Sequence, residues 1–208
     1  MPFYEATKGR GNFVISFYPD PKQEFGGFAR GYHRAAQIIV DHLLSRAGLR
    51  DNDAYPAVFL YRYAFELYLK NIHYNGALLA AFRNVQDLDA KMHCNHNLVA
   101  LAKSASAILR RLFPQDQELD RFCLEMAIVA TEFTEIDPAS MSYRYPINKD
   151  GDASTRHHQV VSLVSLRSTM DRILDGLDTV DFGIQINTDE AQVLWEILRA
   201  VELGKPIP

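Results

Sequence analysis

Four ionisable residues recur at helical spacing within one of the most apolar segments of this chain. Successive members are four, four and three residues apart, so a helix would place all of them on one narrow stripe. The other positions of the segment are mostly aromatic or aliphatic around the whole helix, which is typical of a central helix packed on several sides. Charges on such a helix must be paired or must face a groove open to water. The stripe consists of Arg62, Glu66, Lys70 and His73.

Two interpretations of this stripe stay open. In the first, Glu66 and Lys70 form an exposed salt-bridge ladder in the favourable order, which contributes only about 0.3–0.5 kcal/mol. In the second, the stripe is the floor of a polar groove that it shares with the long loops. Arg62, Glu66 and Lys70 would then be binding residues.

A long polar connection from Pro138 to His158 carries a second candidate. Within it, proline at 146 holds Tyr145 extended, so Arg144 lies on a stiff segment between two aromatic rings. An arginine in this setting binds a phosphate bidentately or anchors its loop to a carboxylate such as Glu66. We therefore add Arg144 and Tyr145 to the candidate site.

The other long connection, from Asn84 to Asn97, contains the sequence His93-Cys94-Asn95-His96. Connections of more than about 12 residues are uncommon in compact domains unless they bind something or are disordered. A zinc site needs four ligands, and the fourth would have to come from His73 or from the distant pair at 157 and 158. We expect no metal and no cofactor, and interpret His96 as a hydrogen-bonding residue at the start of a helix.

Apolar residues recur every three or four positions through most of the chain after Gly27, which predicts an all-α helical bundle. We expect three parts: an N-terminal arm over residues 1–27 with a β-prone piece at Phe13–Tyr18, a bundle over 28–180, and an extension with one further helix over 181–208. The predicted helices of the bundle span about 28–47, 55–76 or beyond, 97–113, 117–136 and 159–177.

The last helix is expected to stand apart from the bundle. Asp181-Phe-Gly183 and the β-prone Ile184-Gln-Ile186 would interrupt the helical pattern, and Thr188 followed by two acidic residues would cap a new helix.

Composition restricts the class of protein. The 208 residues include 22 Lys+Arg and 26 Asp+Glu, for a net charge of −4, and 48% are hydrophobic, which excludes a disordered chain or a broadly basic nucleic-acid coat. The basic residues are spread thinly, so we expect no binding to duplex DNA. Two cysteines do not form a disulfide framework, and neither a signal peptide nor an apolar run of about 20 residues is present. We expect a soluble, cytoplasmic protein.

Taken in order, the motifs resemble those of the HEPN superfamily, the higher eukaryotes and prokaryotes nucleotide-binding domains. The resemblance covers about residues 30–178. It implies an antiparallel up-and-down bundle, usually a homodimer, of a kind found in toxin–antitoxin modules, in phage defence and as partners of minimal nucleotidyltransferases. The motifs are Glu66-Leu-Tyr-Leu-Lys70, His96-Asn97-Leu98 and Tyr143-Arg144-Tyr145-Pro146.

Many members of that superfamily are metal-independent ribonucleases in which an arginine is followed, after four to six residues, by a histidine. No arginine of this sequence has a histidine at that distance. The nearest histidines after Arg144 are His157 and His158. A longer loop would have to fold one of them back, so that the imidazole deprotonates a ribose 2′-hydroxyl while the guanidinium stabilises the phosphorane.

Three functional hypotheses follow. The first is a binding module for RNA, a nucleotide or a protein partner in a bacterial defence or toxin–antitoxin context, with an antitoxin or a nucleotidyltransferase as candidate partners. The second is a metal-independent ribonuclease that uses Arg144 with His157 or His158. The third is a non-catalytic interaction protein whose polar stripe orients helices within a homodimer. We favour the first, without catalysis.

Overall fold

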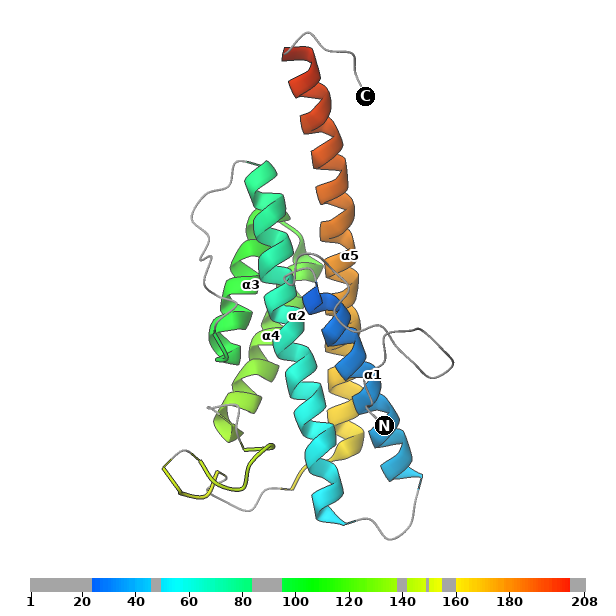
Figure 1. Ribbon diagram of the computed structural model, residues 1–208, viewed down its shortest axis with the longest axis vertical. Coiled ribbons are helices and arrows are strands. Elements are labelled where there is room, and N and C mark those ends of the chain that lie inside the picture. Colours follow the sequence, from blue (N-terminus) through cyan, green and yellow to red (C-terminus); the bar gives the residue numbers. More distant parts are fainter. Residues whose placement is uncertain are drawn as a thin grey trace, which may run out of the picture.

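The computed structural model describes residues 24–45, 50–83, 95–137, 142–148, 150–154 and 160–202. This part of the chain contains five α-helices, one short 3-10 helix and an isolated antiparallel bridge between Ile147 and Ala153, which confirms the all-α helical bundle. None of the described helices is both long and apolar enough to cross a bilayer. The elements are α1 (Phe25–Leu44), η2 (Asp51–Asp53), α2 (Ala54–Phe82), α3 (Leu98–Leu112), α4 (Gln117–Ile136) and α5 (Leu163–Glu202) (Figure 1).

Several predicted sequence elements fall outside this range. Most of the expected N-terminal arm, with the β-prone piece at Phe13–Tyr18, lies outside the described residues. The same holds for His93, Cys94, His157 and His158.

Capping side chains explain where α3 and α4 begin. Asn97 caps α3, since its side-chain Oδ1 accepts a hydrogen bond from the backbone N–H of Ala100 at 2.9 Å. Asp116 caps α4 in the same way, with Oδ1 at 3.0 Å from the backbone nitrogen of Leu119. The α4 helix has the bounds expected from the sequence.

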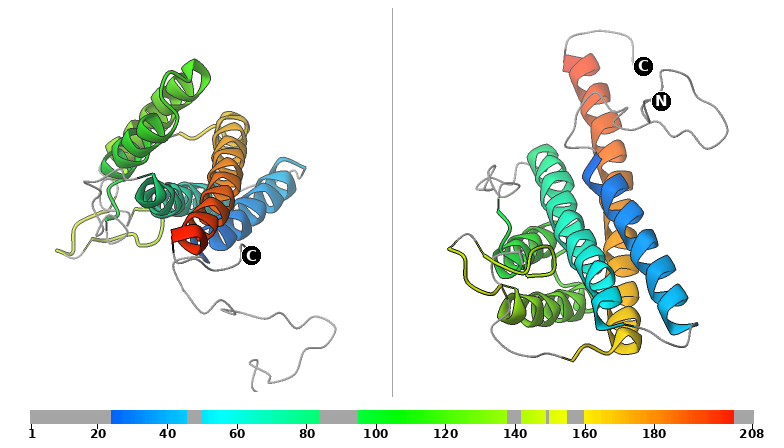
Figure 2. Two further views of the ribbon diagram at one scale, coloured as in Figure 1. Left: turned by 90° about the horizontal axis from the view of Figure 1, so that it is seen from above. Right: turned by 60° about the horizontal axis from the view of Figure 1, so that its bottom comes forward.

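The α2 helix lies at the centre of the bundle, as its apolar circumference predicted. Helices α1 and α5 pack on one side of it, and the α3–α4 pair lies on the other (Figures 1 and 2). Helix α4 also touches α5. The fully buried side chains of α2 include Tyr61, Phe65, Tyr68, Leu69, Ile72 and Leu79.

The α2–α3 pair departs from the expected up-and-down order. His73 meets Ser104, and further along both helices Arg83 donates a hydrogen bond to the carbonyl oxygen of Leu112. The residue numbers of both helices increase from the first contact to the second, so α2 and α3 run parallel. In a strict up-and-down bundle, consecutive helices would be antiparallel. The segment before α3 lies beside the middle of α2, since His96 bonds Glu66, and the connection after residue 83 is long enough to bring the chain back there.

Two glycines allow the helices to approach closely. A Cβ atom added at Gly76 of α2 would lie 2.5 Å from Cγ2 of Ile108 on α3. One added at Gly176 of α5 would lie 2.5 Å from the Phe122 ring of α4. Each glycine therefore leaves room for one large side chain of the neighbouring helix.

The expected break after residue 180 is wrong, because α5 is one continuous helix of 40 residues. Thr188, the expected cap, instead bonds backward within the helix: its hydroxyl donates to the carbonyl of Ile184 at 2.8 Å, and the neighbouring Asn187 amide donates to that of Gly183 at 2.9 Å. Ile184 is fully buried, so packing in the bundle outweighs the helix penalty of about 1 kcal/mol for a glycine at 183. Helix α5 thus passes straight through the domain boundary expected there.

Candidate functional site

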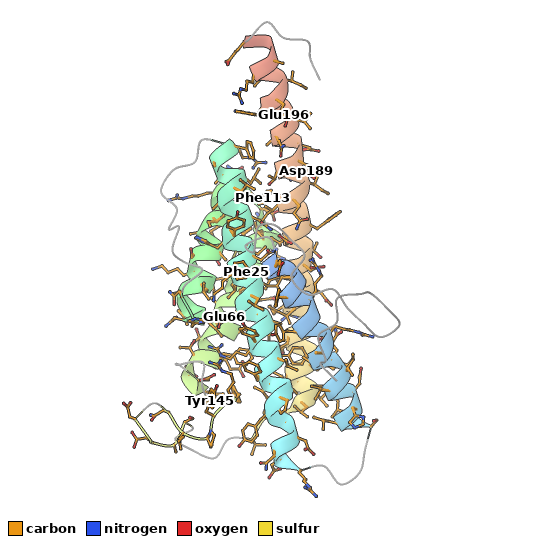
Figure 3. All side chains as sticks on the ribbon, in the orientation of Figure 1. Phe25, Glu66, Phe113, Tyr145, Asp189 and Glu196 are labelled. Carbon is orange, nitrogen blue, oxygen red and sulfur yellow. The ribbon has the colours of Figure 1, made fainter. Side chains whose placement is uncertain are left out.

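Glu66 is the centre of a buried polar network on α2. Its side chain is fully buried and is hydrogen-bonded on both carboxylate oxygens. Oε1 accepts from Lys70 Nζ at 2.8 Å and from His96 Nδ1 at 2.8 Å, while Oε2 accepts from Arg62 Nη1 at 3.1 Å (Figure 3). The helical spacing places Arg62 and Lys70 one turn on either side of Glu66, and the start of α3 supplies His96.

The network continues to the end of α4 and into the following loop. Arg62 Nε lies 3.2 Å from Oδ2 of Asp137, the residue after the last turn of α4. Asp137 Oδ1 accepts from the backbone N–H of Ser142 at 2.9 Å, and the Ser142 hydroxyl donates to the carbonyl of Ser154 at 2.9 Å. We call Arg62, Glu66, Lys70, His96 and Asp137 the Glu66 network.

The formal charges of the Glu66 network balance. Two cations face two carboxylates, so the network is neutral when His96 is neutral. Burial alone would raise the pKa of Glu66, but hydrogen bonds and charges from Lys70 and His96 outweigh it and hold this pKa below its usual range. Glu66 is therefore an anion at neutral pH.

Exposure separates His96 from the rest of the network. The side chains of Arg62, Glu66 and Lys70 are at most 5% exposed, so the exposed-ladder interpretation of the stripe is wrong. The His96 side chain is 66% exposed, although its Nδ1 bonds Glu66. The network thus orients the exposed imidazole of His96 from the protein interior. Arg62, Glu66 and Lys70 lie beneath the surface and do not form the floor of a groove open to water.

Arg144 lies against α2, on the stretch that precedes Glu66. Its guanidinium carbon is 5.7 Å from the ring centroid of Phe59 and 5.7 Å from that of Tyr145, within the range of cation–π contacts. Phe59 and Glu66 are seven residues apart on α2, or about 10 Å along the helix axis. Arg144 is exposed, and Tyr145 is 51% exposed.

The charges of both Arg144 and Glu66 act on the pKa of Tyr63. Burial raises the pKa of Tyr63, as do Tyr32 and the charge of Glu66, while Arg144 opposes them. Both charges are therefore close to this phenol. Its ring stacks on Phe59 with centroids 5.5 Å apart, which continues the aromatic surface toward the centre of the bundle.

Tyr143 lies on the other side of the same loop. Burial and the charge of Asp137 raise the pKa of Tyr143 to about 12, and Arg62 opposes them. Tyr143 thus packs close to the Arg62–Asp137 pair, one residue before the exposed Arg144. The aromatic rings that frame Arg144 in the sequence therefore differ in role, since Tyr143 anchors the loop and Tyr145 faces solvent.

Of the remaining predicted residues, the structure describes only His73. His73, the fourth member of the stripe, has its Nδ1 at 2.9 Å from the Ser104 hydroxyl and so connects α2 to α3. His157 and His158, the histidines proposed for catalysis, lie outside the described residues. Within the described ranges, no group of three or more His, Cys, Asp or Glu side chains is arranged to hold a metal ion.

Sequence reasoning missed Asp137 and Phe59. Neither residue is among the candidates that the sequence analysis proposed. The sequence offered one indication for Asp137: it is a carboxylate at the end of α4, and a buried carboxylate needs a hydrogen-bond donor or a cation as its partner. It is 2% exposed in the structure.

Sequence reasoning also missed a second polar cluster, between α1, α2 and α5. Asp171 accepts hydrogen bonds from the Tyr61 hydroxyl at 2.9 Å and from His33 Nε2 at 2.8 Å. One heptad further on, Asp178 accepts from Tyr68 at 3.0 Å and from Arg30 at 3.1 Å.

A third carboxylate, Asp181, completes this cluster near the end of the bundle. It is 1% exposed, and it accepts from the side-chain amides of Asn75 and Gln185, each at 2.7 Å. We call Asp171, Asp178 and Asp181 the α5 carboxylate row. Their partners on α2 are seven residues apart at 61, 68 and 75, a regular pattern that was visible in the sequence.

The α5 carboxylate row holds helices together. Hydrogen bonds from His33, Tyr61 and Gln37 overcome the effect of burial and lower the pKa of Asp171, so it stays ionised. Burial and the bond to Asp171 raise the pKa of Tyr61, so its hydroxyl stays a donor. Each carboxylate of the row joins α5 to α2, and Asp171 and Asp178 also join it to α1.

Comparisons of the chain with family models, with curated proteins and with solved structures find no match.

Proposed function

We propose that this chain is a binding module for single-stranded RNA or a nucleotide. The binding surface consists of Phe59, His96, Arg144 and Tyr145, which we call the His96–Arg144 surface. One observation carries the proposal: a buried, charge-balanced network positions both ends of this surface. Glu66 bonds His96 at one end, and the connection from Asp137 to Ser142 holds the loop of Arg144 at the other.

The residue types of the His96–Arg144 surface suit phosphate and base together. A guanidinium donates two parallel hydrogen bonds to a phosphate, which a lysine does not. An exposed aromatic ring such as Tyr145 stacks on a base, and such stacking contributes about 1–3 kcal/mol per base. His96 adds a hydrogen-bond donor or, when protonated, a second cation.

Local recognition fits the charge of the whole chain. A net charge of −4 gives no broad basic surface that could follow the backbone of a duplex. Single-stranded RNA instead exposes its bases to stacking and needs fewer phosphate contacts. We therefore expect a short binding footprint and weak binding to duplex DNA.

The HEPN resemblance supports the same class of ligand and suggests a biological context. It rests on the sequence around Glu66, His96 and Arg144, all of which contact α2 or lie on it: Glu66 belongs to α2, His96 bonds Glu66, and Arg144 lies over Phe59. A homodimer, an antitoxin or nucleotidyltransferase partner and a role in bacterial defence are part of this proposal. The pairing of Glu66 is complete within one chain, so the polar stripe does not require a dimer.

The binding proposal is tested by fluorescence anisotropy with a labelled single-stranded RNA of mixed sequence. We expect Arg144→Ala and Tyr145→Ala each to raise Kd about tenfold, and Arg144→Ala also to reduce the dependence of Kd on salt. Arg121→Ala removes an exposed arginine near the far end of α4 and is the matched control. Equal affinities for the wild type and all three variants would contradict the proposal.

The ribonuclease hypothesis is a second candidate, since Arg144 is an exposed cation beside the surface proposed for RNA. The same RNA is incubated with the protein in EDTA, and its length is followed on a gel. Cleavage that is lost in Arg144→Ala and in His157→Ala or His158→Ala would establish this activity. Intact RNA with the wild type, or equal cleavage by the variants, would remove it and leave the binding proposal untouched.

A further inference from the structure

A single heptad pattern runs along most of α5. Residues spaced alternately by three and four positions are apolar at every point but one, as in the seam of a coiled coil. This spacing continues without a change of phase through residues 181–187, where the sequence suggested a break. The seam residues are Leu163, Leu166, Met170, Ile173, Leu177, Val180, Ile184, Asn187, Ala191, Leu194 and Leu198.

The first half of this seam is covered by the bundle. Met170, Ile173, Leu177 and Ile184 are at most 1% exposed, packed in the same core as α2. Helix α2, which runs parallel to α5, ends at Phe82, and the following Arg83 donates from Nη2 to Asn187 Oδ1 at 2.7 Å. The polar seam residue thus marks the point where α2 stops.

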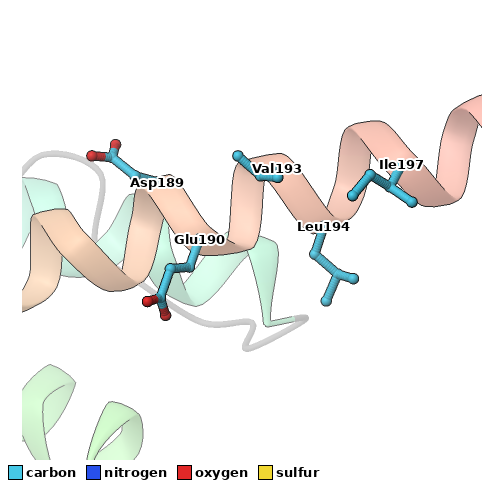
Figure 4. A pocket seen from close by; sticks show the side chains of 5 residues that line it. All are labelled: Asp189, Glu190, Val193, Leu194 and Ile197. Atoms are coloured by element: carbon cyan, nitrogen blue, oxygen red, sulfur yellow. The ribbon is translucent and has the colours of Figure 1, made fainter. Parts of the chain in front are cut away.

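Beyond that point α5 projects past the ends of α2 and α3 (Figure 1). Its apolar side chains there are largely exposed, at 58% for Leu194, 49% for Trp195 and 55% for Leu198. Val193 is 56% exposed and belongs to an open hollow of about 410 Å³ that Asp189, Glu190, Leu194 and Ile197 also line (Figure 4). The seam therefore continues as an exposed apolar face.

The projecting segment is also strongly acidic. Residues 186–202 contain four acidic residues and one arginine, for a net charge of −3. The arginine, Arg199, lies over the ring of Trp195 with its guanidinium carbon 5.0 Å from the ring centroid. The apolar face is thus flanked mainly by carboxylates, two of which line the hollow.

We propose that residues 187–202 of α5 bind an amphipathic helix of a second protein, one whose apolar stripe is flanked by lysine or arginine. Such a helix packs on the α5 seam in the place that α2 would occupy if it extended beyond Phe82. Its apolar stripe covers Leu194 and Leu198, and its flanking cations face Glu190 and Glu202. A second copy of this segment fits less well, because it brings another net charge of −3 to the same place.

Trp195 makes the proposal directly measurable. It is the only tryptophan in the chain, so fluorescence excited at a wavelength that tyrosine does not absorb reports on this face alone. The probe is a synthetic 21-residue peptide of three heptads with leucine at both seam positions and lysine at both flanking positions. A matched peptide carries glutamate in place of every lysine.

We expect the lysine peptide to shift the Trp195 emission to shorter wavelength and to bind at least tenfold more tightly than the glutamate peptide. The affinity should fall as salt is raised, because opposite charges contribute to it. A double variant, Leu194→Gln with Leu198→Gln, should lose the shift while keeping its net charge and its far-ultraviolet circular dichroism. Ile128→Gln, which changes a 66% exposed isoleucine on α4, is the control and should bind like the wild type.

Three results would overturn the proposal. They are no response to either peptide, equal affinity for both peptides, and a concentration-dependent dimer in sedimentation that the Leu194→Gln, Leu198→Gln double variant abolishes. The last result would assign the face to a second copy of the chain. None of these measurements involves the His96–Arg144 surface, so they leave the RNA proposal unchanged.

Discussion

Glu66 and Asp181 are buried to the same extent, yet their pKa values move in opposite directions. Glu66 is 0% exposed and Asp181 is 1% exposed. The pKa of Glu66 is lowered because Lys70 and His96 outweigh burial, whereas the pKa of Asp181 is raised because burial outweighs the hydrogen bond from the Asn75 amide. The difference shows that the type of partner, more than the depth of the site, decides in which direction the pKa of a buried carboxyl group moves.

The two sides of α2 also differ in what their carboxylates do. On the α3 side, Lys70 and His96 keep Glu66 an anion at neutral pH, and Glu66 orients the exposed His96. On the α5 side, Asp171 and Asp178 accept from tyrosine hydroxyls and from His33 and Arg30, and Asp181 accepts from amides, all between packed helices. The first arrangement positions a surface residue, and the second holds helices together.

The largest effect is expected from Glu66→Gln. The variant keeps the shape of the side chain but leaves Lys70 buried without its carboxylate and Arg62 with Asp137 alone. Removing one partner of a buried ion pair destabilises by about 3–5 kcal/mol, which urea denaturation at pH 7 would measure. Glu135→Gln changes an exposed glutamate of α4 and should alter the free energy of unfolding by less than about 0.5 kcal/mol.

The effect of Glu66→Gln should depend on pH. Because the folded-state pKa of Glu66 is depressed, its stabilising contribution is present above the unfolded pKa of about 4.3 and is lost as pH falls through the folded value. The difference between wild type and variant should therefore shrink below about pH 4. A difference that stays constant down to pH 2 would mean that the charge of Glu66 does not matter.

An intermediate effect is expected from Tyr61→Phe on the α5 side. The substitution removes one hydrogen bond to Asp171, whose side chain is 22% exposed, and should destabilise by about 1–2 kcal/mol in the same assay. Tyr68→Phe removes the corresponding bond to Asp178, which is 45% exposed and better solvated, so we expect less than about 1 kcal/mol. The reverse order would mean that exposure does not govern the strength of these bonds.

The smallest effect is expected from Asp181→Asn, with less than about 1 kcal/mol at pH 7, since the charged form of Asp181 is already disfavoured. A folded-state pKa above the unfolded one means that Asp181 favours the folded state at low pH and that this contribution is lost as pH rises through the folded value. The variant should therefore gain stability relative to wild type between pH 4 and pH 7. A relative loss over that range would show that Asp181 has the same electrostatic role as Glu66.

The sequence predicted those parts of the fold and site that depend on local spacing. The stripe at Arg62, Glu66 and Lys70 follows from 3.6 residues per turn, and the predicted start of a helix near residue 97 agrees with the Asn97 cap, because capping involves residues three positions apart. Asp137 and Phe59 join the site through the path of a loop, which local pattern does not specify. The parallel α2–α3 pair also depends on how a connection folds.

The misreading of α5 has a different origin. Asp181, Gly183 and Thr188 favour a break when only their neighbours in sequence are considered. Their actual partners are Asn75, which is 106 residues away, and carbonyls of the same helix. Tertiary packing overrides the local preference here, as it does at Ile184, which is fully buried.

The long separation along the chain between α5 and its partners on α1 and α2 has a consequence for synthesis of the protein. The bond from Tyr61 to Asp171 joins residues 110 positions apart, and α5 supplies the carboxylates for both α1 and α2. At about 5–20 residues per second, a ribosome adds those 110 residues in roughly 5–20 s. During that interval the nascent α1–α2 hairpin exposes the apolar face that α5 later covers. Chaperones that hold nascent chains should therefore engage this hairpin before α5 leaves the ribosome.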